Sequence, residues 1–258
     1  MSKIISVSGQ KGGCGKSTVT IIMASMLAYK YGKKVLVVDA DTNQHSIAKK
    51  RQLDIKTITL EPTGEQDENG NNKMAPKNWE IYDQVVALKQ KGIDPYMIAE
   101  ANLDYKEILP ILEKEEDNYD FILLDLPGNV DSESYFKVIR YADVIFIPFI
   151  VDDVDFDSNF PFAKLLHDKF LNTSVSNIKD MYYFWNKFDS DTRKGMYNEM
   201  QGILTKEMPN AKAIENKMND TSAVKNVKCR NTLCAPVGRF EEYGNVGTTV
   251  IEMCQKVL

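Results

Sequence analysis

Short apolar runs recur along the chain, with longer segments of mixed polarity between them. Runs that read as buried strands cover 3–8, 34–39, 119–126, 143–150 and 181–186, and a last short strand is expected over 211–214. Their apolar residues are continuous instead of alternating with polar ones. This pattern is typical of parallel strands that are covered on both faces.

The segments between these runs carry apolar residues at helical spacing. In 16–31, Val19, Ile22 and Met26 recur at spacings of three and four, which places an apolar stripe against a sheet. Further helices are expected over 79–91, 94–101, 105–116, 156–170, 191–207 and 241–258, the second of them opening on Asp94-Pro95. The alternation predicts an α/β domain with a doubly wound, mostly parallel sheet and helices on both faces.

One segment breaks this pattern. Residues 61–78 read EPTGEQDENGNNKMAPKN, which is polar, rich in turn-forming residues and almost without apolar side chains to bury. We expect an exposed loop or the tip of a hairpin. A chain of 258 residues is long for one core, so the interpretation is a single domain over 1–258 with this insertion.

Composition excludes few functions. The hydrophobic and charged fractions, 43% and 27%, are those of an ordinary globular protein, and the net charge of −5 argues against a generally basic surface for nucleic acid. No apolar run approaches the length of a membrane span and the first residues do not resemble a signal peptide, so a cytoplasmic protein is expected. The four cysteines lack zinc-site spacing, and free thiols are expected.

Candidate chemistry begins between the first strand and the first helix. The loop over 9–17 reads GQKGGCGKS, and glycines let its backbone N–H groups approach an anion at the amino end of a helix. Lys16 supplies a point charge, and the Ser17 hydroxyl is a ligand for Mg²⁺. The predicted nucleotide-binding residues here are Gly12, Gly13, Cys14, Gly15, Lys16, Ser17 and Thr18.

The loop departs from the plain phosphate-binding motif G-x-x-x-x-G-K-[ST], because Gln10 stands where that motif has glycine. It fits K-G-G-x-G-K-[ST] at every position, with Lys11 as the first lysine. The chain therefore resembles the ParA/MinD family of P-loop ATPases. The resemblance implies that it binds ATP with Mg²⁺, that it forms a homodimer in the ATP state, and that Lys11 acts in catalysis beside Lys16 by reaching the partner subunit's phosphates.

The second apolar run ends in two carboxylates, Asp39 and Asp41, at the strand end where ligands bind in parallel sheets. The residues VDADTNQ resemble the D-x-D-x-x-Q segment of ParA-like ATPases. By that resemblance Asp41 orients the attacking water and Asp39 helps to hold the hydration shell of Mg²⁺. The alternative is that both carboxylates cap the helix that begins near Asn43 or Ser46.

The third apolar run ends in Asp125, followed by Leu-Pro-Gly. A buried strand with a terminal aspartate after a phosphate-binding loop is the Walker B pattern, in which the carboxylate holds Mg²⁺. Gly128 stands at the D-x-x-G spacing whose backbone N–H touches the γ-phosphate in P-loop switches.

The base is predicted from Asn186. The residues NKFD over 186–189 match the guanine-reading motif N-K-x-D, whereas ParA-like proteins often use an asparagine here to contact adenine. Because Lys11 belongs to the second group, ATP is expected, and GTP remains the alternative.

A basic segment lies near the carboxyl end. Residues 206–230 hold six bases and three acids, a net charge of +3. ParA-like proteins bind DNA without sequence preference through such a surface, which implies phosphate contacts by Lys212, Lys217, Lys225, Lys228 and Arg230. A solvated helix face explains the same pattern. The last predicted helix is not basic, which argues against membrane binding.

The resemblance implies a function. We expect an ATP-driven dimerisation switch with slow hydrolysis, stimulated by a partner protein, in partition or transfer of a plasmid or mobile element. The alternative is a metabolic phosphoryl-transfer enzyme of the dethiobiotin-synthetase type, whose loop is similar. An iron-sulfur reductase of the nitrogenase-iron-protein type is disfavoured, because its paired bridging cysteines have no evident counterpart in the sequence.

Overall fold

A computed structural model describes residues 1–41, 46–128, 133–189, 194–219, 229–236 and 245–258 of the chain. Its centre is a seven-stranded sheet in the order β5-β2-β6-β1-β7-β8-β9, in which every neighbouring pair is parallel. The strands are β1 (Lys3–Val7), β2 (Val35–Asp39), β5 (Met97–Glu100), β6 (Phe121–Asp125), β7 (Val144–Phe149), β8 (Asp180–Trp185) and β9 (Lys212–Ala213). The predicted parallel sheet is confirmed.

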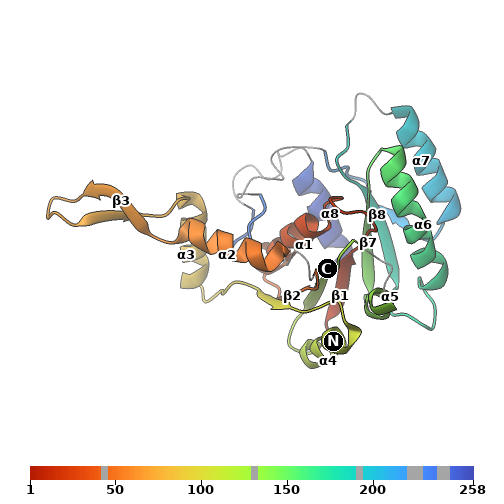
Figure 1. Ribbon diagram of the computed structural model, residues 1–258, viewed down its shortest axis with the longest axis horizontal. Helices are drawn as coiled ribbons and strands as arrows, with labels where there is room; N and C mark the ends of the chain where they lie inside the picture. The colour runs from red at the N-terminus through yellow and green to blue at the C-terminus, as the bar shows by residue number, and fades with distance from the viewer. Residues whose placement is uncertain (42–45, 129–132, 190–193, 220–228, 237–244) are drawn as a thin grey trace.

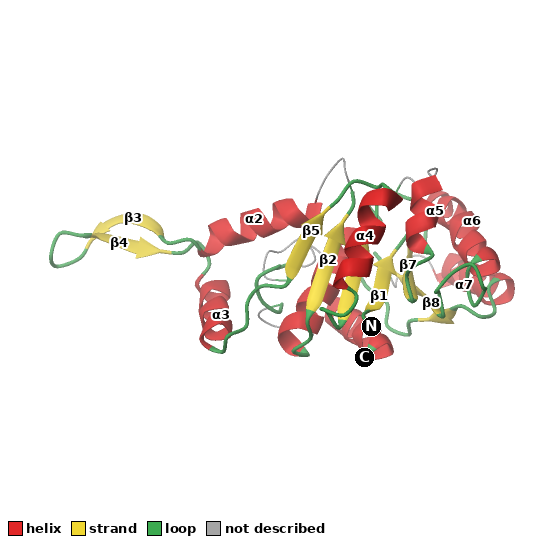
Figure 2. Cartoon of the chain, turned by 90° about the horizontal axis from the view of Figure 1, so that it is seen from below, coloured by secondary structure: helices red, strands yellow, loops and turns green. Residues whose placement is uncertain are grey.

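Helices cover both faces of this sheet (Figures 1 and 2). Successive residues of a buried strand point to opposite faces, so Leu123 packs in one apolar cluster and Leu124 in the other. The first cluster contains α1 (Lys16–Ser25), the π-helical turn η1 (Met26–Lys30) and α8 (Val246–Val257). The second contains α4 (Tyr105–Glu115), α5 (Glu133–Ile139), α6 (Asp153–Lys169) and α7 (Lys194–Glu207).

Helix boundaries follow the predicted pattern with a few differences. The two helices expected over 191–207 and 241–258 are described from Lys194 and from Val246, and residues 190–193 and 237–244 lie outside the described part of the chain. Helix α5 was not predicted. It has only seven residues, which is too short for a helical spacing of apolar residues to stand out in the sequence. None of the helices in the described residues is both long and apolar enough to cross a membrane.

The helix expected over 94–101 is wrong. Residues Met97–Glu100 form strand β5, which pairs with β2 through Val37 and Ile98 and through Val38 and Ala99. This stretch completes the edge of the sheet, and the strand pairing outweighs the helix-start signal of Asp94-Pro95. Pairing with a distant strand is not visible in local spacing.

The polar insertion forms a separate antiparallel hairpin, β3 (Glu61–Gln66) with β4 (Asn72–Ala75). It extends from the body between α2 (Ser46–Ile58) and α3 (Trp79–Gln90), at the opposite end of the molecule from α7 (Figure 1). At its turn the Asp67 carboxylate accepts backbone hydrogen bonds from Asn69 and Asn71, both at 2.9 Å. Of the two expected forms, an exposed loop or the tip of a hairpin, the structure has the hairpin.

Candidate functional site

The glycine-rich loop lies between the carboxyl end of β1 and the amino end of α1, as predicted. Gly15 is the residue before α1, with a left-handed φ of 97°, and Gly13 has a φ of 76°. A Cβ on Gly15 would also stand 2.4 Å from the Asn186 side-chain nitrogen. Glycine is therefore required at this position by conformation and by space.

A cavity of about 300 Å³ opens on this loop. It is lined by Gly12, Gly13, Gly15, Lys16, Ser17, Thr18, Asp41, Ser46, Gly128 and Arg230. Most of the predicted nucleotide-binding residues thus surround one space, although they come from three strand ends. Loops at the carboxyl edge of a parallel sheet converge in this way.

Lys16 is held inside the loop. Its side chain is buried, with the residue 8% exposed, and its ammonium donates to the Lys11 carbonyl at 3.0 Å. A Cβ on Gly128 would lie 2.9 Å from this ammonium and 3.1 Å from the Gln10 carbonyl oxygen. The glycine therefore lets the end of β6 and the loop approach each other, which brings Lys16 beside the Walker B segment.

Asp125 ends strand β6 as a fully buried carboxylate. Burial raises the pKa of Asp125 to about 7, the Asp39 and Asp41 charges also raise it, and the Ser17 hydroxyl and Lys16 ammonium lower it. Among the described residues, neither carboxylate oxygen has a hydrogen-bond partner at normal distance. A buried carboxylate with open acceptors next to a serine hydroxyl suits Mg²⁺, which prefers oxygen ligands and shares its shell with phosphates.

Asp39 and Asp41 have different surroundings. The Asp39 carboxylate accepts hydrogen bonds from the backbone of Ile47 and Ala48, both at 3.0 Å, and so caps the amino end of α2. Helix capping, the alternative role considered for both carboxylates, is therefore observed for Asp39. Asp39 also stands opposite Asp125 in the pairing of β2 with β6, whereas Asp41 lines the cavity. Asn43, one of the two expected starts of this helix, and Gln44, the last residue of the VDADTNQ segment, lie outside the described residues.

Lys11 forms an ion pair within its own chain. Its ammonium lies 2.7 Å from a carboxylate oxygen of Asp155, in the first turn of α6, and about a third of its side chain is exposed. The lysine is therefore placed at the surface by a partner on a neighbouring helix.

Asn159 was missed by the sequence analysis. Its side chain accepts from the Gln10 backbone at 2.8 Å and donates to the Pro148 carbonyl at 2.6 Å, so it ties the loop to β7. A Cβ on Gly9 would stand 3.0 Å from the Asn159 side-chain oxygen. No motif surrounds this residue, since its role depends on a contact between α6 and a loop far away in sequence.

Asn186 contacts the loop as well. Its amide donates to the Cys14 carbonyl at 2.7 Å, and its own oxygen accepts from the Lys187 backbone at 2.8 Å. Asn186 is buried beside the loop and is not among the residues that line the cavity. Cys14 is buried too, and burial raises the pKa of its thiol, which fits a packed side chain better than a reactive one.

The predicted basic surface is only partly described. Lys212 pairs with Asp180 at 2.7 Å, and Lys217 lies over the rings of Phe188 and Tyr197. Lys225 and Lys228 lie outside the described residues. Arg230 differs from the other described bases, because it lines the cavity at the glycine-rich loop.

Comparison with known proteins agrees with this geometry. The family model described as "AAA domain" matches residues 2–157. The sporulation initiation inhibitor protein Soj of Bacillus subtilis is 28% identical over 160 residues, which cover 57% of this chain and 58% of Soj. The matched region thus spans little more than half the length of that relative.

Two solved structures share the fold over nearly the whole chain. The MinC:MinD cell division protein complex of Aquifex aeolicus matches with a TM-score of 0.63 at 17% identity, covering 99% of this chain and 96% of that one. A plasmid partition protein from Borrelia burgdorferi matches with a TM-score of 0.55 at 17% identity, covering 100% and 99%. At this identity the likeness concerns the fold alone.

Proposed function

Because the chain belongs to the ParA/MinD family of P-loop ATPases, we propose that it is an ATP-dependent dimerisation switch with slow hydrolysis. The observation that carries the proposal is the convergence of Lys16, Ser17 and Asp125 at the glycine-rich loop. Two of these groups would hold a metal ion and one would hold phosphate oxygens. Such an arrangement supports phosphoryl transfer from a nucleoside triphosphate.

The loop and its lysine would bind the substrate. Lys16 would exchange its hydrogen bond to the Lys11 carbonyl for phosphate oxygens, and the loop N–H groups would cradle the remaining charge. Ser17 and Asp125 would hold Mg²⁺, which neutralises negative charge on the phosphates when bound. Asp39 would add its charge to the same shell while its carboxylate caps α2.

Asp41 would orient the attacking water. It lines the same cavity as the loop, so its carboxylate can accept a hydrogen bond from a water near the terminal phosphate. Gly128 also lines the cavity and would offer its backbone N–H to that phosphate. Asn186 would help to shape the adenine site from its position against Cys14, which makes ATP the proposed nucleotide.

Lys11 would act across a homodimer. Its bond to Asp155 is a partly exposed ion pair, which is worth about 1 kcal/mol and can be exchanged for the partner subunit's phosphates. Binding of ATP to both subunits would then close the dimer. Part of the free energy of ATP binding would therefore stabilise the dimer.

The biological role follows from the switch. We propose that the dimer acts in the cytoplasm in partition or transfer of a plasmid or mobile element, with a partner protein that stimulates hydrolysis. Nonspecific DNA contacts would come from Lys212, Lys217, Lys225 and Lys228. Phosphate contacts of this kind weaken steeply as salt concentration rises.

Calorimetry and hydrolysis assays test the proposal. We expect the chain to bind ATP with Mg²⁺ more tightly than GTP, and Lys16→Ala to abolish this binding. We expect Asp41→Ala to bind ATP and to lose hydrolysis. Retained binding in Lys16→Ala would contradict the proposal, and hydrolysis that depends only on an added metabolite would favour the phosphoryl-transfer enzyme.

A further inference from the structure

A short irregular segment crosses the molecule between the cavity and helix α2. We call residues 229–234 the strap. Five of its six residues are buried although it belongs to no helix or strand, and the exception is Arg230. Buried irregular backbone needs polar partners, so the contacts of the strap show what it is built to hold.

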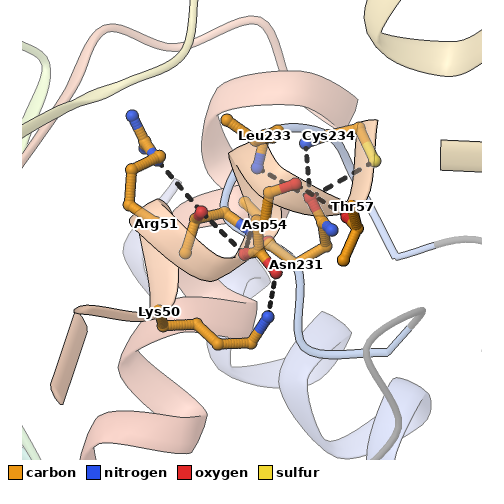
Figure 3. Close-up of polar contacts among 9 residues, drawn as sticks. Lys50, Arg51, Asp54, Thr57, Asn231, Leu233 and Cys234 are labelled. Carbon is orange, nitrogen blue, oxygen red and sulfur yellow. Dashed lines mark hydrogen bonds and ion pairs between the residues drawn. The ribbon is translucent and has the colours of Figure 1, made fainter. Parts of the chain in front are cut away.

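The first anchor joins the strap to α2 (Figure 3). The buried Asp54 carboxylate accepts hydrogen bonds from the Thr232 backbone at 2.9 Å and from the Thr232 hydroxyl at 2.8 Å. Lys50, one turn earlier, forms an ion pair with the other oxygen of the same carboxylate. Arg51 donates to the Thr232 hydroxyl at 3.0 Å. Three charged side chains from about one turn of α2 thus hold Thr232, Arg51 and Asp54 directly and Lys50 through Asp54.

The second anchor joins the strap to the first helix and its continuation. Ser25 donates to the Asn231 carbonyl at 2.5 Å, and Tyr29 donates to the Thr232 carbonyl at 2.7 Å. The Asn231 side-chain oxygen accepts from the Leu233 backbone at 2.8 Å, which fixes the turn of the strap itself. The backbone on the carboxyl side of Arg230 is therefore held in one position relative to α1 and α2.

Arg230 points away from these anchors, into the cavity. Its guanidinium makes one long hydrogen bond, to the Thr18 hydroxyl at 3.4 Å, and its Nε is buried without a partner among the described residues. The same cavity contains Lys16, so two cations face one space. A guanidinium has five donors arranged to match phosphate oxygens, and the described part of the chain engages one of them, in the bond to Thr18.

We propose that Arg230 is a nucleotide-binding residue, supplied in cis by the strap, whose guanidinium binds a phosphate of the nucleotide beside Thr18. This inference rests on the proposed nucleotide site. It reassigns Arg230 from the DNA-binding surface to the nucleotide. Because Asn231 and Thr232 are already tied to α1 and α2, a phosphate bound to Arg230 would restrain the strap further and, through it, α2, the helix that leads to the β3–β4 hairpin.

Affinity for the nucleotide tests this directly. Arg230→Ala should weaken binding of ATP with Mg²⁺ by roughly tenfold to a hundredfold, the usual worth of hydrogen bonds to a charged group. Arg230→Lys keeps the positive charge but lacks the paired donors of the guanidinium, so its affinity for ATP should lie between those of the wild type and Arg230→Ala. Arg140→Ala is the matched control, since it removes the same charge from a side chain that lies over Tyr141. Its affinity should equal that of the wild type.

The outcomes separate the two proposals. If Arg230→Ala binds ATP within about twofold of Arg140→Ala while Lys16→Ala does not bind, the inference is overturned and the nucleotide site stands. If Lys16→Ala binds ATP normally, the nucleotide site itself fails. Thermal unfolding without nucleotide checks whether each variant is folded. If Arg230→Ala is not folded, the ATP affinity of Arg230→Lys is compared with that of Arg140→Ala instead.

Hydrogen exchange tests the link to α2. In the wild type, ATP should slow amide exchange in 9–17, in the strap and in 46–58. In Arg230→Ala at saturating ATP, the additional protection caused by ATP should remain in 9–17 and should disappear in the strap. Equal protection of the strap in both proteins would overturn the assignment.

Discussion

At the scale of single residues, the cavity depends on charges that are held apart from water. Asp125 is buried beside Asp39 and Asp41, and in the described part of the chain Lys16 and Ser17 offset the effect of this crowding on Asp125. Without a ligand this arrangement costs stability, because a buried carboxylate disfavours its charged form. The same negative charge would bind Mg²⁺ when the cation enters the site together with phosphates.

Asp125 should make the stability of the unliganded protein depend on pH. Its pKa is raised from 3.8 to about 7 in the folded chain, so the folded state holds the proton where the unfolded state has lost it. Stability should therefore fall as pH rises from about 4 to about 7, by at most about 4 kcal/mol from this group. Asp125→Asn should remove that fall, as measured by urea unfolding at several pH values. Identical pH profiles for the two proteins would contradict the assignment.

Asp155→Asn should release Lys11 at little cost. The exposed part of this ion pair limits its worth to about 1 kcal/mol, so the free energy of unfolding should change by less than that. Dimerisation with ATP should become up to about fivefold tighter for each Lys11 that no longer has to leave a partner, or about 25-fold for the two lysines of the dimer. Analytical ultracentrifugation measures this, with Asp180→Asn as the control, since Asp180 pairs with Lys212 at the same 2.7 Å. Weaker dimerisation of Asp155→Asn would show that the pair supports the dimer.

Sequence reasoning found the residues whose role is local. Gly15, Lys16 and Asp125 follow strands or open a helix, and their chemistry is visible within a few positions. Asn159 and Arg230 could not be found in this way, because each reaches the loop from a distant part of the chain. Arg230 was even assigned to another surface, since its charge was visible and its direction was not.

At the scale of elements, α2 and the strap depend on one buried carboxylate. Removing Asp54 would leave Lys50 and the Thr232 backbone without their partner in a buried place. We expect Asp54→Ala to lower the free energy of unfolding by about 3 kcal/mol. Glu133→Ala breaks an exposed pair of the same spacing, with Lys137, and should lower the free energy of unfolding far less, because water screens this pair. Urea unfolding compares them, and equal losses would show that the Asp54 pair is not structural.

The β3–β4 hairpin should be dispensable for nucleotide binding. All but one of its strand residues are exposed, and Glu61 stands opposite Ala75, so a two-residue turn can replace the residues between them. We expect the shortened chain to unfold within about 1 kcal/mol of the wild type and to bind ATP equally well. Calorimetry checks this. A loss of ATP affinity would mean that the hairpin contributes to the site.

Elements were predictable where burial was strong. The five long apolar runs became β1, β2, β6, β7 and β8, because only central strands are covered on both faces. The edge strand β5 was mistaken for a helix, since Met97–Glu100 is short and partly exposed. Edge strands are defined by the neighbour with which they pair, and local spacing carries little of that information.

At the scale of the whole molecule, the proposed switch depends on how the parallel sheet assembles its site. The parallel sheet brings the ends of β1, β2 and β6 to one edge, and the cavity forms there. Lys11 lies at the surface beside this cavity, in a pair that can be exchanged. The central claim is that two ATP-bound subunits form a dimer in which Lys11 of each subunit binds the phosphates of the other.

Sedimentation velocity with ATP and with ADP, each with Mg²⁺, tests that claim most directly. The account predicts a dimer of the wild-type chain with ATP and a monomer with ADP. Calorimetry should show that Lys11→Ala still binds ATP, and sedimentation should show that it remains a monomer. A wild-type chain that stays monomeric with saturating ATP, or a Lys11→Ala variant that dimerises as the wild type does, would contradict it.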